Sequence, residues 1–151
     1  MYSIVNMDKL DKTTWLSEGL KIIESEGYAR ITVDNLCEKL QRSKGSFYFH
    51  FKNIGGYVEA LMDYWLEERT ISIIRKVNTL KKIEKKKKLV DKLALERSLK
   101  LGQNIRAWSY SNEIVKNKLC EADKIRTEYL TELGIQEGKE QSYAKDVGML
   151  T

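Results

Sequence analysis

The residues of this chain best suited to chemistry lie in residues 39–52, which carry four basic side chains and no acidic one. Lysine and arginine in such a stretch can pair with phosphate groups. The whole chain has a formal net charge of +5, yet its first 65 residues hold eight basic and nine acidic side chains. The local stretch, rather than the overall charge, therefore indicates contact with nucleic acid.

The sequence offers little for other kinds of chemistry. One histidine, His50, and two distant cysteines, Cys37 and Cys120, fit no metal-ligand spacing and no catalytic grouping. We therefore expect two reduced thiols, no metal, no cofactor and no catalytic residue, and an enzyme is the least supported alternative. The apolar runs are too short to span a bilayer and the N-terminus lacks a signal-peptide block, which predicts a cytoplasmic protein without membrane contact.

The elements that must position the basic stretch are predicted to be helices. The chain has no proline, which is the costliest interruption of a helix, so we expect an all-α protein. After a polar arm at residues 1–12, apolar spacing predicts a helix that starts at Thr13 or Thr14 as cap and ends before Gly27. Two short helices follow at residues 33–40 and 44–51.

Those two short helices are the informative pair. Thr32 and Ser43 are good N-cap residues for them, and only about three residues separate the two. Helices joined so tightly cross at a steep angle, which is the geometry of a helix-turn-helix. Such a pair places its second helix in the DNA major groove. Phe47 and Phe51, one turn apart, are expected in the core.

The rest of the chain also has helical character. Asn53 is predicted to cap a long helix that runs to about residue 79, and the cationic run 81–88 is interpreted as a solvated helix end or loop. Leucines from residue 89 to 101 predict one helix that continues to Trp108. Ser111-Asn112 is predicted to cap one or two further helices, which are expected to end at Gly134. Residues 135–151 show no clear packed face.

The N-terminal segments closely resemble the DNA-binding domain of the tetracycline-repressor (TetR) family. The resemblance rests on residues 15–28, on Ile31-Thr-Val-Asp-Asn-Leu36, and above all on Ser43-Lys-Gly-Ser-Phe-Tyr-Phe-His-Phe51. It covers residues 13 to about 65 and continues weakly through residues 105–108, Asn112 and residues 123–126. It implies a three-helix head at residues 1–52 and a helical ligand-binding and dimerisation domain, a C-terminal bundle, at residues 53–151.

The resemblance also implies which residues meet DNA. Lys44 is expected at a guanine edge or a phosphate, while Gly45 and Ser46 let the helix approach the groove closely. For Tyr48, phosphate contact and half-buried packing are both open, and Ser43 is a cap before it is a contact. Ile54 stands where many members have a lysine, so a phosphate contact is not expected there. The full predicted set is Thr32, Arg42, Ser43, Lys44, Gly45, Ser46, Tyr48, His50 and Lys52.

The implied function is sequence-specific transcriptional regulation. The resemblance predicts a repressor that binds a palindromic DNA operator as a homodimer and responds to a small-molecule inducer. Trp108, Tyr110 and Tyr129 are candidate pocket residues, with ordinary core packing as the alternative for each. Family members commonly run further at the C-terminus. A shortened body therefore gives a second hypothesis: an interaction protein, or a constitutive DNA binder with no inducer response.

Overall fold

The computed structural model describes the backbone of residues 11–150 and the side chains of residues 11–147, so most of the predicted arm at residues 1–12 lies outside the described residues. All regular structure in this range is helical and it contains no strand, which confirms the all-α prediction. The chain divides into two compact units. Unit 1 is formed by the chain up to Leu66 together with Ser98–Leu119, and unit 2 by Glu67–Arg97 together with the chain from Cys120 onward.

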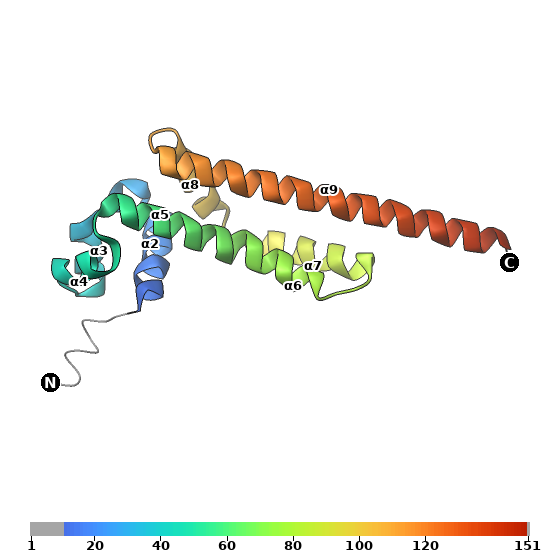
Figure 1. Cartoon of the computed structure of the whole chain (residues 1–151), viewed down its shortest axis with the longest axis horizontal. Coiled ribbons are helices and arrows are strands. Elements are labelled where there is room, and N and C mark those ends of the chain that lie inside the picture. Colours follow the sequence, from blue (N-terminus) through green and yellow to red (C-terminus); the bar gives the residue numbers. More distant parts are fainter. Residues whose placement is uncertain (1–10, 151) are drawn as a thin grey trace. The chain divides into compact units, whose positions relative to one another are not determined.

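Unit 1 contains the predicted helix pair, and Figure 1 shows α3 and α4 beside each other near the start of α5. Helix α2 contacts α3, α5 and α8, while α4 packs on both α3 and α5. The pair itself has the predicted bounds. The helices of unit 1 are α2 (Lys12–Glu26), the short 3₁₀ helix η1 (Tyr28–Arg30), α3 (Val33–Leu40), α4 (Lys44–Phe51), α5 (Ile54–Leu66), α8 (Leu99–Ser109) and the start of α9 (Glu113–Leu150).

The core of unit 1 forms where α2 and α5 approach closely. Gly19 permits this approach, because a Cβ at that position would collide with the Tyr57 hydroxyl and the Leu61 side chain. The Tyr57 hydroxyl donates a 2.7 Å hydrogen bond to the Trp15 carbonyl oxygen, so its burial costs no unpaired polar group. The Asn104 side chain of α8 donates to the Ile23 carbonyl oxygen at 2.7 Å and fastens α8 to α2.

Unit 2 is built from the remaining helices. The helical path that begins with α5 continues through a π-helical turn, η2 (Glu67–Ile71), into α6 (Ser72–Asn78), so a helix to about residue 79 is confirmed. Helix α7 (Ile83–Glu96) contacts α6, and the greater part of α9 completes the unit. The cationic run predicted as a solvated helix end or loop occupies the last loop residues and the first two turns of α7. None of the helices in the described part of the chain is long and apolar enough to cross a membrane.

Three predictions of helix ends are wrong. Asp11, not Thr13 or Thr14, caps α2, because its carboxylate accepts from the Thr13 N–H at 3.2 Å. The leucines from 89 to 101 belong to two helices, since Arg97 and Ser98 are extended and the Ser98 hydroxyl accepts from the Leu101 N–H to start α8.

The third concerns Gly134, which does not end a helix: α9 continues through it to Leu150. An interior glycine costs only about 1 kcal/mol relative to alanine, and the left-handed backbone that a C-cap glycine adopts is absent there. Gly27, by contrast, does terminate α2 with φ of 89° as predicted.

Candidate nucleic-acid interface

The turn between α3 and α4 is fixed by backbone hydrogen bonds at both helix ends. Gln41 adopts the left-handed conformation, with φ of 53° and ψ of 51°. The Arg42 N–H donates to the Cys37 carbonyl at 3.0 Å and the Gln41 N–H to the Glu38 carbonyl at 3.2 Å, which is the Schellman arrangement of a helix C-terminus. Ser43 then begins α4, since its hydroxyl accepts from the Ser46 N–H at 3.2 Å. The predicted cap is confirmed.

The inward face of α4 is held by aromatic rings. Phe47 and Phe51 are 0% and 4% exposed, as predicted for core residues. Their rings lie 5.7 Å and 6.3 Å from the ring of Trp15, and 5.6 Å and 4.9 Å from that of Tyr57, measured between centroids. Because these contacts come from α2 and α5, they fix the rotation of α4 about its own axis. They thereby determine which side chains of α4 point outward.

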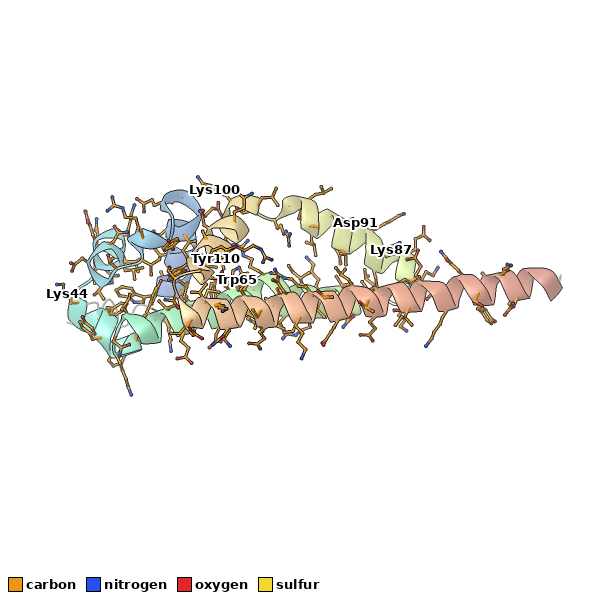
Figure 2. All side chains as sticks on the ribbon, turned by 90° about the horizontal axis from the view of Figure 1, so that it is seen from above. Lys44, Trp65, Lys87, Asp91, Lys100 and Tyr110 are labelled. Atoms are coloured by element: carbon orange, nitrogen blue, oxygen red, sulfur yellow. The ribbon has the colours of Figure 1, made fainter. Side chains whose placement is uncertain are left out.

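The outward face of α4 contains Lys44, Gly45, Tyr48 and Phe49, all exposed, and Lys52 follows at its C-terminal cap. Residues three and four apart share a face of a helix, so these side chains form one surface. Figure 2 shows Lys44 at one end of unit 1, away from the buried Trp65. Phe49 was not among the predicted contacts. The sequence could have indicated this contact, because Phe49 follows Gly45 by four residues and so shares its face of the helix.

Gly45 is not required by the packing of the protein itself. A Cβ at this position would have the Ser43 hydroxyl, at 3.7 Å, as its nearest described neighbour, which is ordinary van der Waals contact. Gly56 differs, since its Cβ would collide with the Phe51 carbonyl oxygen. Close packing at the start of α5 therefore requires a glycine at residue 56. The space beside Gly45 is open to the exterior.

Lys44 forms an ion pair that sequence analysis did not predict. Its Nζ lies 3.0 Å from Asp34 Oδ1, in the first turn of α3, and both side chains are well exposed. The hydrogen bond to the Asp34 carboxylate raises the pKa of Lys44 above its ordinary value. A phosphate or base edge that binds the Lys44 ammonium must therefore compete with the Asp34 carboxylate for its N–H donors.

The other predicted contacts differ in accessibility. Thr32 is exposed and its hydroxyl accepts from the Asn35 N–H at 3.1 Å, so its role as N-cap is confirmed. Arg42 is partly buried, and its guanidinium donates to the Gln41 carbonyl at 3.1 Å. Ser46 is 6% exposed and lies inside the head. Thr32 therefore lies at the surface, as does the outward face of α4, whereas Ser46 faces the interior.

His50 and Lys52 lie at the end of α4. The Nε2 atom of His50 is buried and has no hydrogen-bond partner among the described residues, and its ring lies 5.1 Å from that of Phe49.

Lys52 has φ of 61° and ψ of −49°. It is the central residue of a tight turn, which is closed by a 2.6 Å hydrogen bond from the Asn53 N–H to the Phe51 carbonyl. This turn is a strained γ-turn. It directs the chain from α4 into α5, where the Asn53 side chain accepts from the Gly56 N–H and so caps α5 as predicted.

The three candidate pocket residues belong to different units. Trp108 is buried in unit 1 and stacks on Tyr28 with ring centroids 5.9 Å apart, while Tyr110 is 93% exposed. Tyr129 belongs to unit 2, where its hydroxyl donates to the Asn78 side chain at 2.7 Å. It borders a cavity of about 310 Å³ that is lined by Ile74, Asn78, Lys86, Ile125, Glu128, Tyr129, Glu132, Leu133 and Gln136. Only Tyr129 of the three lines this cavity.

Two eight-residue helices joined by a three-residue turn, with an aromatic core that orients the second helix, define a helix-turn-helix domain of the DNA-binding class. Residues 16–61 match the family model of bacterial regulatory proteins, tetR family. This segment is therefore a TetR-family DNA-binding domain, and the resemblance identified in the sequence is confirmed.

A curated relative supports the same assignment. The chain is 35% identical over 63 residues to a protein of Vibrio anguillarum named "Tetracycline repressor protein class G". The aligned part is 42% of this chain and 30% of that relative, so the chain spans less than a third of the length of the curated relative it matches. No solved structure matches the chain significantly.

Proposed function

We propose that this protein is a transcriptional repressor that binds a palindromic DNA operator as a homodimer and releases it when a small molecule binds unit 2. One observation carries the DNA-binding part of the proposal: the outward face of α4. Lys44 and Gly45 lie there together, and nothing in the described structure requires a glycine at residue 45. A glycine at that position instead suits a helix that must approach the floor of the major groove.

Around this face, exposed Thr32 and Lys52 and the phenol of Tyr48 have groups that can meet phosphates on either side of the groove. A His50 contact to phosphate would have to use Nδ1, because Nε2 is buried. Ser46 supports the helix from inside the head and is not proposed as a contact. Arg42 has to release the Gln41 carbonyl oxygen to reach DNA.

The test is a fluorescence-anisotropy titration against operator DNA selected from random duplexes, at two salt concentrations. Lys44→Ala is expected to weaken binding and to lower the slope of log affinity against log salt by about one unit. Lys100→Ala, at an exposed lysine of α8, is the matched control and should change neither quantity. Equal losses for Lys44→Ala and Lys100→Ala would remove α4 from the interface.

Two further variants sharpen this test. Asp34→Asn removes the competitor for Lys44 and a negative charge close to the phosphates, so it should strengthen binding. Gly45→Leu should abolish operator binding, yet leave the melting curve of the domain close to that of the wild type, because residue 45 has open space around it. A folded Gly45→Leu protein that still binds its operator would overturn the placement of α4 in the groove.

The dimer and the ligand response rest on unit 2. Its helices expose large apolar side chains, which a second copy of the chain would cover: Leu95, Leu130, Ile135 and Tyr143. Light scattering at micromolar concentration should show a dimer, and a monomer would contradict the repressor proposal.

The cavity beside Tyr129 has the volume of a small-ligand site. A compound that releases DNA should lose its effect in Leu133→Trp, which fills the cavity. Retained release in that variant would place the inducer elsewhere. If no compound releases DNA, the protein is a constitutive DNA binder.

A further inference from the structure

Phe49 is an exposed aromatic residue in a position that the fold does not use. The chain has three phenylalanines, and two of them, Phe47 and Phe51, are buried in the core of unit 1. The third, Phe49, is 69% exposed on the same helix. Its described ring contact is with His50, at 5.1 Å between centroids. Packing of the head therefore does not explain why an apolar ring stands here.

The neighbours of Phe49 describe the surface around it. Gly45 lies one turn earlier on the same face, so the ring has an open space beside it on the N-terminal side. Lys44 and Lys52 lie toward the two ends of this face, and α4 contains no acidic residue. The surface is thus an apolar centre between two lysines, one of which, Lys44, is paired with Asp34 of α3.

We propose that Phe49 is a specificity-determining residue that packs against the 5-methyl group of thymine in the operator; this inference rests on the DNA-binding function proposed above. Phenylalanine has no donor or acceptor, so it cannot read the polar edge of a base or pair with a phosphate. The major groove presents one apolar group on its base edges, the thymine methyl. The flanking lysines match the phosphates on both sides of such a groove, which favours DNA over an apolar protein partner as the occupant of this face.

The experiment removes the methyl group from DNA and the ring from the protein separately. Each thymine of the selected operator half-site is replaced in turn by uracil, which keeps every hydrogen-bonding group and lacks only the methyl. For the wild-type protein, uracil at one position should weaken binding about fourfold, the effect expected for one lost buried methyl group. For Phe49→Ala, thymine and uracil at that position should bind equally.

Leu99→Ala is the matched control, because Leu99 is a large apolar residue of unit 1 that is 67% exposed and lies outside α4. It should bind the operator as the wild type does and keep the uracil effect. Thermal melting of Phe49→Ala should match the wild type, since an exposed ring adds little to the core. Lys44→Ala should bind more weakly overall and still distinguish uracil from thymine.

The outcomes separate the two proposals. If the wild-type protein binds no DNA sequence specifically, the regulator function itself fails. If it binds specifically and every thymine tolerates uracil, or if Phe49→Ala keeps the full uracil effect, the role of Phe49 is overturned and the regulator function stands.

Discussion

Three aromatic rings are completely buried in unit 1, those of Trp15, Phe47 and Tyr57, whereas the apolar side chains that unit 2 buries among the described residues are all smaller. These are Val77, Ile83, Ala122 and Leu133. Buried apolar area is the main source of stability, so unit 1 can hold its side chains in fixed positions and unit 2 has less to oppose a rearrangement. The difference suits a rigid head that presents α4 and a body that changes when it binds a partner or ligand.

Removing the largest fully buried side chain should produce the largest effect. Trp15→Ala is expected to lower the free energy of unfolding of unit 1 by about 3–5 kcal/mol, because it leaves a cavity against Phe47 and Phe51. Urea denaturation followed by tryptophan fluorescence measures this, since Trp65 and Trp108 remain in unit 1. Leu133→Ala, in unit 2, should leave that fluorescence transition unchanged. A loss below about 1 kcal/mol for Trp15→Ala would contradict the difference between the units.

A smaller loss is expected where two helices approach closely. Gly19→Ala places a methyl group against the Tyr57 hydroxyl and should cost about 1–3 kcal/mol, because the hydrogen bond to the Trp15 carbonyl has to shift. Gly102→Ala on α8 is the matched control. A Cβ there has no described heavy atom within 4 Å, so that change should be neutral or stabilising. The same urea titration compares the two variants, and a loss as large in Gly102→Ala would argue against a specific contact at Gly19.

In unit 2 a glycine substitution should act in the opposite direction. Gly134 is inside α9, and a Cβ there has no described heavy atom within 4 Å. Gly134→Ala should therefore stabilise the helix by up to about 1 kcal/mol through the higher helix propensity of alanine. Circular dichroism at 222 nm during heating reports this gain. A decrease in melting temperature would indicate a neighbour that approaches Gly134 in the assembled protein.

The mildest comparison leaves the sequence unchanged and uses the two thiols. Cys37 is buried in unit 1, and burial, followed by the negative charge of Asp34, raises the pKa of its thiol. The thiolate is the reactive form, so Cys37 should react slowly with a disulfide reagent at pH 8, while exposed Cys120 in unit 2 reacts first. Mass spectrometry of the labelled peptides identifies the order. Equal rates would mean that unit 1 opens as readily as unit 2.

The sequence predicted unit 1 better than unit 2, for a physical reason. In the head, local signals and the core agree: Thr32 and Ser43 each accept the capping hydrogen bond expected of them, and Phe47 and Phe51 are buried. In unit 2, an apolar pattern does not reliably mark the core, since Leu95 is 88% exposed although it fits such a pattern. Leu95 lies just before the break between α7 and α8, and that break depends on Ser98, whose capping role is common to many surface serines.

Parts of the candidate interface required coordinates. The pairing of Lys44 with Asp34 joins two helices whose crossing depends on the left-handed Gln41, a residue type that gives no strong signal for that conformation. Burial of Ser46 also depends on how far α4 is rotated by the rings around it. The DNA contacts themselves, the pocket residues and the division into residues 1–52 and 53–151 stay predictions.

Unit 1 is assembled from two separated stretches of chain, and this has a consequence for synthesis on the ribosome. Asn104 and Trp108 complete the surface of α2 and η1 from a segment that is made long after them. At about 5–20 residues per second, the nascent head waits several seconds with part of its apolar surface uncovered. Rare codons between the two stretches would lengthen that interval and expose the growing chain to chaperones and proteases.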